Sequence, residues 1–142
     1  AFPGAMREGG IDRGSLKALI ADDPGALDRL SAIVHPLVAA DREAFIARHT
    51  AAPLVVLDIP LLYENGYETQ MDGVAVVSTD ADTQRQRVLA RPGMTEDLLA
   101  LILSRQMPDA EKRARADWII PTDSPDTARR AVESIVKEIA HA

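Results

Sequence analysis

The sequence predicts an α/β fold in which a parallel sheet is flanked by helices. Three short apolar runs show no alternation with polar residues, which is typical of strands buried on both faces. They cover residues 54–57, 74–77 and 118–120. Helical patterns lie before, between and after them, and strands that alternate with helices favour a parallel sheet. Three strands are few for this architecture, so either a strand is missing or another chain completes the sheet.

The opening of the chain is predicted to be a loop followed by a short helix. Residues up to Gly9-Gly10 have the composition of a loop. Ser15 is a good cap for a helix that runs to about Ala21. The sequence begins without Met, and we expect that it starts within a longer protein.

A longer helix is predicted from Asp23-Pro24 to about His49. Asp23 is a capping acid, and Pro24 suits the first helical turn. Pro36 lacks an N–H, crowds the preceding turn and disfavours helical geometry at His35. We therefore expect a kink or a break near His35.

The second half of the chain is predicted to hold a helical hairpin, a short helix and a final helix. The first hairpin helix is expected from Thr79 or Asp80 to about Arg91, and the second from Thr95 to about Met107, with a break at Pro92-Gly93 between them. The short helix is expected at 109–115, and the final helix begins after the cap at Ser124. With the strands, these elements predict four regions: helical 1–52, core strands and a loop 53–80, hairpin helices 81–116, and a final strand and helix 117–142.

Composition excludes several classes of protein. Of 142 residues, 46% are hydrophobic and 27% are charged, which is ordinary for a folded chain. The net charge of −6 disfavours a nucleic-acid binder. No apolar run is long enough to span a membrane. Cysteine is absent, which fits a reducing cytoplasm, the location that we expect.

Arginine is concentrated in one stretch. Residues 85–115 carry six Arg and one Lys against four acids, a local balance of +3. Arg forms bidentate hydrogen bonds to phosphate, which favours a phosphate-binding role. The alternative is a solvated helical face.

Acidic and apolar residues follow the run at 54–57. Asp58 stands at the carboxyl end of that predicted strand, where ligands of α/β sheets bind, and an acid there can hold Mg²⁺ or its waters. The alternative is an acid that caps the next turn. In the following turn, Pro60, Leu61 and Tyr63 offer an apolar wall between Asp58 and Glu64, which we interpret as a binding loop.

The predicted hairpin resembles a flap over a phosphate. Gln84, Arg87 and Arg91 are spaced i, i+3 and i+7, so they share one helical face. Arg on the inner side of a flap neutralises a transferring phosphoryl group and excludes water. Further basic and polar side chains follow at Arg105, Gln106 and Lys112. The alternative is a surface hairpin with ion pairs to Glu96, Asp97 and Glu111.

The sequence contains no G-x-x-x-x-G-K-[ST] motif. The three lysines, Lys17, Lys112 and Lys137, do not follow Gly. A chain without this phosphate cradle is expected to bind ATP poorly alone.

In order and spacing, these motifs resemble the dephospho-CoA kinase family from about Gly10 to Ile120. The most specific parts are residues 58–64 and 105–117, and the others are Ile11-Asp12-Arg13 with Leu16, Leu30, Ile33, His35-Pro36, Gln84, Arg87, Arg91 and Gly93. The resemblance implies a P-loop kinase fold with a helical CoA domain and a lid. It also implies that the first strand and the P-loop are missing here. The implied reaction moves the γ-phosphate of ATP to the ribose 3′-hydroxyl of dephospho-CoA, with Mg²⁺.

The resemblance also implies roles for individual residues. His35 and the loop residues Pro60, Leu61, Tyr63 and Glu64 would line the acceptor site, and Arg87 and Arg91 would act on phosphate from the lid. Gln84, Arg105, Gln106 and Lys112 would support the lid, and Asp58 would hold Mg²⁺ through water.

The sequence departs from the family after residue 120. It reads Pro121-Thr122-Asp123-Ser124 where many members have Asn and Gly near the adenine, so no adenine contact is assigned. Two other functions stay open: another small-metabolite or nucleoside kinase, and a non-catalytic module that binds CoA or a partner.

Overall fold

The computed structural model describes residues 2–23 and 25–141. The chain divides into two compact units, Ala1–Val56 and Leu57–Ala142, and each is described by itself. Within the described residues, no helix is long and apolar enough to cross a bilayer.

The first unit begins with structure where a loop was predicted. A 3-10 helix, η1 (Pro3–Ala5), precedes an antiparallel pair of two-residue strands, β1 (Met6–Arg7) and β2 (Gly10–Ile11). The tight turn between them needs glycine, because Gly9 has φ 97° and Gly10 has φ 143°.

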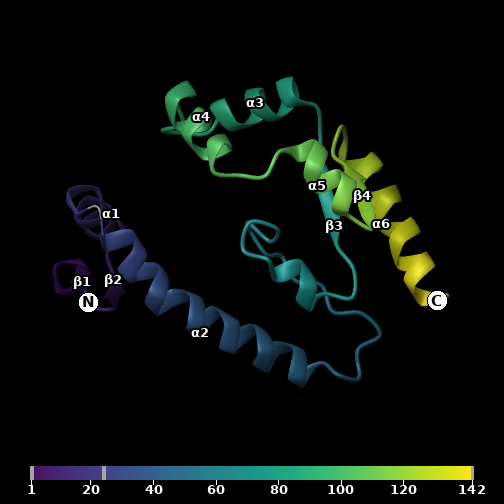
Figure 1. The fold of residues 1–142 in the computed structure, drawn as a ribbon, viewed down its shortest axis with the longest axis horizontal. Coiled ribbons are helices and arrows are strands. Elements are labelled where there is room, and N and C mark those ends of the chain that lie inside the picture. Colours follow the sequence, from purple (N-terminus) through teal and green to yellow (C-terminus); the bar gives the residue numbers. More distant parts are fainter. Residues whose placement is uncertain (1, 24, 142) are drawn as a thin grey trace. The chain divides into compact units, whose positions relative to one another are not determined.

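Two helices complete the first unit (Figure 1). Helix α1 (Arg13–Asp22) is capped by Asp12, which accepts a 2.7 Å hydrogen bond from the Ser15 backbone, so the prediction of Ser15 as the cap was wrong. Helix α2 (Ala26–Arg48) follows. Of the predicted start, Pro24 lies outside the described residues, and Asp23 follows α1 as its C-cap.

A kink or a break was predicted near His35, and the break does not form, because α2 is continuous for 23 residues with Pro36 inside it. A proline removes one hydrogen bond and crowds one carbonyl. Ten helical residues precede Pro36 and twelve follow it, from Ala26–Arg48. Propagation along both arms offsets that local cost, since each added residue supplies a backbone bond.

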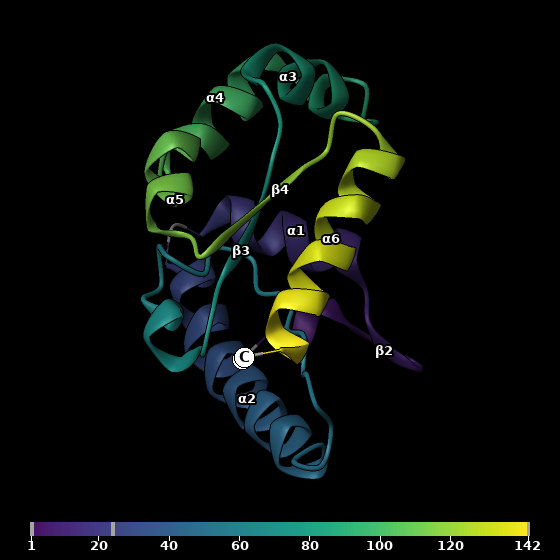
Figure 2. The same ribbon diagram turned by 90° about the vertical axis from the view of Figure 1, so that its right-hand side faces the viewer.

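The second unit is the α/β part of the chain. Strands β3 (Ala75–Ser78) and β4 (Trp118–Pro121) pair in parallel, with Ala75 opposite Trp118. The other elements are η2 (Tyr67–Gln70), α3 (Ala81–Leu89), α4 (Glu96–Ser104), α5 (Asp109–Arg115) and α6 (Pro125–Ala140). Helix α6 packs along β4 and α5 packs against β3, on opposite sides of the pair in Figure 2. The predicted α/β class with a parallel sheet is confirmed.

The predicted strand at residues 54–57 does not form. These residues have no ladder partner among the described residues, and Val56 is 77% exposed. An apolar run becomes a strand only when a neighbouring strand takes its N–H and C=O groups. The core region predicted at 53–80 therefore holds one strand, β3.

The predicted hairpin of α3 and α4 is confirmed. Asp80 caps α3 through the Thr83 N–H at 2.8 Å, and Thr95 caps α4 through the Leu98 N–H at 3.2 Å. Gly93 has φ 77°, which lets the chain reverse between the two helices. Two of the three acids predicted as ion-pair partners form such pairs, since Arg85 pairs with Glu96 and Arg115 with Glu111.

Gly73, just before β3, is in close contact with Trp118 of β4. A Cβ at Gly73 would lie 2.5 Å from Cζ3 of the Trp118 ring. Gly73→Ala is therefore expected to displace the ring and lower the free energy of unfolding by about 1–2 kcal/mol. Urea unfolding compares Gly73→Ala with Gly66→Ala. At Gly66, φ is 68° and a Cβ would meet no atom within 4 Å, so that variant reports backbone strain alone. Gly73→Ala reports the clash with Trp118. An unfolding midpoint unchanged in Gly73→Ala would contradict the contact.

Candidate active site

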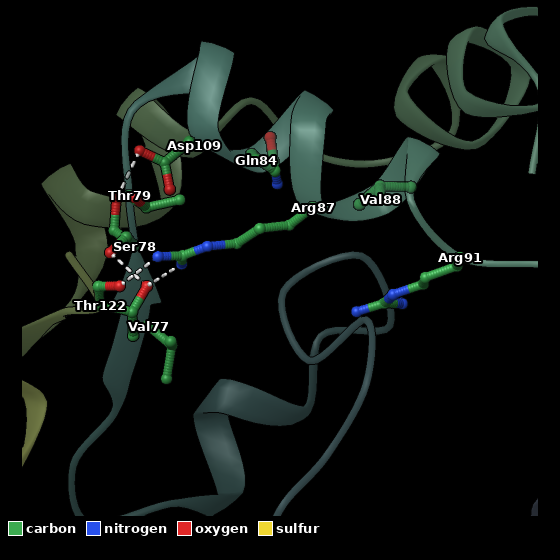
Figure 3. A pocket seen from close by; sticks show the side chains of 9 residues that line it. All are labelled: Val77, Ser78, Thr79, Gln84, Arg87, Val88, Arg91, Asp109 and Thr122. Atoms are coloured by element: carbon green, nitrogen blue, oxygen red, sulfur yellow. Dashed lines mark hydrogen bonds between the residues drawn. The ribbon is translucent and has the colours of Figure 1, made fainter. Parts of the chain in front are cut away.

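A cavity of about 230 Å³ lies at the carboxyl ends of the two paired strands (Figure 3). It is called the Arg-lined pocket below, and its lining residues are Val77, Ser78, Thr79, Gln84, Arg87, Val88, Arg91, Asp109 and Thr122. They come from the end of β3, from α3 and the residues after it, from the start of α5, and from the segment after β4. In parallel sheets this is the edge where ligands bind.

Two arginines line the pocket, Arg87 from α3 and Arg91 from the turn just after α3. Arg87 crosses to the end of β4, where its Nη2 donates to the Thr122 carbonyl at 2.9 Å and its Nη1 to the Thr122 hydroxyl at 3.5 Å. The Arg91 side chain points in the same direction and forms no hydrogen bond or ion pair within the described residues (Figure 3). Arg91 is thus a guanidinium with all its donors available to an anion.

The hydroxyls at the end of β3 differ in their partners. Ser78, 9% exposed, donates to the Asp109 carboxylate at 2.9 Å, which ties the strand to the first turn of α5. The Thr79 hydroxyl is buried and has no hydrogen-bond partner in the part of the chain that the structure describes. Buried polar atoms are seldom left unpaired, so Thr79 is a candidate contact for a ligand in the pocket.

Residues 60–66, called the acceptor loop below after the role that the resemblance implies for them, form a turn closed by its own hydrogen bonds. The Leu61 carbonyl accepts from the Asn65 N–H at 3.1 Å and from the Asn65 side chain at 2.8 Å. The Gly66 N–H donates to the Tyr63 carbonyl at 3.1 Å. Leu61 has φ 56°, an uncommon value for a bulky residue. These bonds hold the loop as a compact block.

Glu64 connects this loop to α5 and to the segment before it. Its Oε1 accepts from the Met107 N–H at 2.8 Å and from Lys112 Nζ at 2.7 Å. The side chains of Glu64 and Lys112 are 15% and 22% exposed. Burial raises the pKa of Glu64, but the hydrogen bond from Lys112 and the backbone N–H groups of Glu64 and Met107 outweigh it, so the pKa lies below its ordinary value.

Tyr63 faces inward in the second unit. It is 8% exposed, and its hydroxyl has no hydrogen-bond partner among the described residues. Burial, followed by the nearby charges of Asp117 and Glu68, raises the pKa of this hydroxyl. The ring therefore contributes to the packing under the loop.

Three of the predicted site residues lie together, and the others do not line the pocket. Gln84, Arg87 and Arg91 line the Arg-lined pocket, as their spacing predicts. His35 is exposed on α2 in the other unit. The remaining predicted residues lie in unit 2 outside the pocket lining: Asp58, Pro60, Leu61, Tyr63, Glu64, Arg105, Gln106 and Lys112.

Sequence reasoning did not single out several pocket residues. Ser78, Thr79 and Thr122 are small polar residues just at or after strand ends, and Asp109 starts a helix. The feature of the sequence that could have identified them is their position at the ends of the predicted strands and helix. Which strand ends meet is decided by the parallel pairing of β3 and β4.

No cluster of three or more His, Cys, Asp or Glu side chains suited to a metal occurs in the described residues. Asp58 is exposed and forms no hydrogen bond or ion pair there. Mg²⁺ keeps several waters and often uses only one or two carboxylates besides substrate phosphates. A free carboxylate such as Asp58 fits that kind of contact, whereas Asp109 is already bonded to Ser78.

Comparison with known proteins gives consistent results. The family model described as dephospho-CoA kinase matches residues 2–127. A dephospho-CoA kinase of Jannaschia sp. (strain CCS1) is 54% identical over 137 residues, covering 96% of this chain and 70% of the relative. One from Mesorhizobium japonicum is 53% identical over 142 residues, covering 98% and 72%. A third, from Novosphingobium aromaticivorans, is 58% identical over 122 residues, covering 86% and 61%.

A solved structure is also similar. The crystal structure of TT1252 from Thermus thermophilus matches with a TM-score of 0.74 and 37% sequence identity. The match covers 96% of this chain and 72% of that one. The chain thus spans between 61% and 72% of the length of these relatives.

Proposed function

The chain belongs to the dephospho-CoA kinase family, and from this premise we propose that it carries the lid and acceptor parts of an ATP-dependent phosphotransferase. The reaction is the transfer of the γ-phosphate of ATP to the ribose 3′-hydroxyl of dephospho-CoA, in the cytoplasm. The observation that carries the proposal is the pair Arg87 and Arg91, which share a pocket at the carboxyl edge of β3 and β4.

The two arginines are proposed to have different tasks. Arg91 has no partner within the described residues, so it is available to a phosphoryl group whose negative charge develops during transfer. Arg87 is held by Thr122 and is proposed to fix the lid against the end of β4. Gln84 lines the same pocket as both.

The acceptor side is proposed to involve the acceptor loop and His35. Pro60 and Leu61 present exposed surface at the start of the loop, and His35 is exposed on α2. Arg105 and Gln106 follow α4 and are proposed to support the lid. Mg²⁺, when bound with ATP, would neutralise phosphate charge, and Asp58 is the carboxylate proposed to hold it through water.

The experiment is an assay of ADP formation with two proteins. We propose that the 142-residue chain is inactive alone, because its sequence has no G-x-x-x-x-G-K-[ST] motif. A chimaera that places the P-loop segment of a full-length family member before Ala1, called the P-loop chimaera below, is expected to form ADP with dephospho-CoA. It should not do so at a comparable rate with AMP or shikimate. ADP formation by the 142-residue chain, or a chimaera that prefers AMP, would contradict the proposal.

A further inference from the structure

Helix α5 is in contact with both functional regions of the second unit. Its first residue, Asp109, lines the Arg-lined pocket and binds the Ser78 hydroxyl at 2.9 Å. Lys112 is three residues further on, hence on the same helical face, and binds Glu64 of the acceptor loop at 2.7 Å. One short helix therefore carries both contacts.

Glu64 makes its two polar side-chain contacts within the protein. Its Oε1 already accepts from Lys112 and from the Met107 N–H. Its Oε2 is buried without a hydrogen-bond partner among the described residues. A residue that contacts the acceptor substrate directly needs an accessible carboxylate oxygen. The contacts of Glu64 therefore favour a role within the protein.

The Lys112–Glu64 pair is also more buried than the ion pairs Arg29–Asp23, Arg85–Glu96 and Arg115–Glu111. The side chains of Arg29–Asp23, Arg85–Glu96 and Arg115–Glu111 are 47% to 57% exposed. Exposed ion pairs contribute little to the free energy of unfolding, because water screens their charges. The 15% and 22% exposure of Glu64 and Lys112 makes their contact the stronger link.

Met107 adds the lid to this linkage. It lies between the end of α4 at Ser104 and the start of α5 at Asp109, and its N–H binds Glu64. The acceptor loop is a compact block closed by its own hydrogen bonds. A displacement of the segment between α4 and α5 would therefore move the whole acceptor loop.

We propose that α5, through Lys112 and Asp109, couples the Arg-lined pocket to the acceptor loop, and that Glu64 is a positioning residue for the acceptor substrate. This inference rests on the proposed function and extends it. Loss of the pair leaves the loop free to shift while the pocket keeps its own residues. The affinity for the acceptor then falls, and the affinity for ATP is nearly retained.

The kinetic test uses Lys112→Met, Lys112→Arg, Glu64→Gln and the double variant Glu64→Gln/Lys112→Met in the P-loop chimaera. Lys112→Met is expected to raise KM for dephospho-CoA about 10-fold, with KM for ATP within about 2-fold, a coupling of ordinary size. Lys112→Arg should restore most of the affinity, and the double variant should be no worse than the worse single variant. Lys137→Met, an exposed lysine on α6, is the matched control.

A direct role of Glu64 would give a different pattern. Glu64→Gln would then raise KM for dephospho-CoA while Lys112→Met left it unchanged, and this would overturn the inference. Lys112→Met lowers the stability of the protein under either reading, so the two KM values separate them. A purely structural role would raise KM for dephospho-CoA and KM for ATP together, which would also overturn the inference.

Hydrogen exchange in the 142-residue chain tests the coupling without activity. In Lys112→Met, the amides of Met107, Asn65 and Gly66 should gain about 10-fold in exchange rate relative to the amides of β4 and α6, compared with the parent chain. Unchanged exchange at Asn65 and Gly66 would refute the linkage. An inactive chimaera combined with faster exchange at these amides would count against the proposed function and leave the linkage supported.

Discussion

Replacing Arg91 with alanine in the P-loop chimaera is expected to lower kcat for ADP formation about 1,000-fold, the scale of an arginine that stabilises phosphoryl transfer. Arg91 lines the pocket and forms no hydrogen bond or ion pair with the described residues. The folded protein thus loses no internal bond when it is removed. The loss should fall on kcat more than on KM for ATP, because the interaction strengthens as charge develops in the transition state.

Steady-state kinetics of three variants measure this effect. Arg91→Lys keeps the charge but not the planar fork, so we expect it to recover only part of the lost rate. Arg129→Ala removes an exposed arginine from α6, away from the pocket lining, and should leave kcat unchanged. An Arg91→Ala chimaera with kcat within 5-fold of the parent would refute the role of Arg91.

Replacing Lys112 with methionine is expected to lower the free energy of unfolding by about 2–3 kcal/mol at pH 7. Breaking a fully buried ion pair costs about 3–5 kcal/mol, and this pair keeps some contact with water. The cost arises because the Glu64 carboxylate stays mostly buried with only backbone N–H groups as partners. Urea unfolding of the 142-residue chain measures it, with Lys137→Met as the control.

The pH dependence of that penalty has a definite sign. In the parent chain the pKa of Glu64 lies below its ordinary value of 4.5, so the stability from this carboxylate is present above pH 4.5 and is lost as the pH falls through the lower folded pKa. In Lys112→Met the cation is gone and the folded pKa rises relative to the parent. Below both pKa values the carboxyl is neutral in both proteins. The difference in unfolding free energy should therefore be largest at pH 7 and shrink as the pH falls below 4.5, and a difference that grew would contradict the ion pair.

Several local features were predictable from the sequence because neighbouring residues determine them. Asp80, Thr95 and Ser124 each cap the helix that was predicted to follow. Gln84 and Arg87 lie on one face of α3, as their i, i+3 spacing predicts, whereas Arg91 lines the same pocket from beyond the end of α3 at Leu89.

The predictions were wrong where a local preference was outweighed by the rest of its helix or depended on a partner elsewhere in the chain. Pro36 was predicted to interrupt α2, but a single proline is outweighed by the helical arms on both sides of it. Residues 54–57 have the composition of a buried strand and yet pair with no strand among the described residues.

By itself, the sequence determined the α/β class, the caps at Asp80, Thr95 and Ser124, and the order of motifs that resembles the family. It also indicated two strands at 74–77 and 118–120, which form at 75–78 and 118–121. The tertiary structure alone decided that Thr122 holds Arg87, that Ser78 is tied to Asp109, and that Glu64 bonds Lys112 and Met107. The partners in the first two of these contacts are 35 and 31 residues apart in the chain. Helical and strand periodicity relates residues only a few positions apart, so contacts of this range are set by the way β3, β4 and α5 pack together.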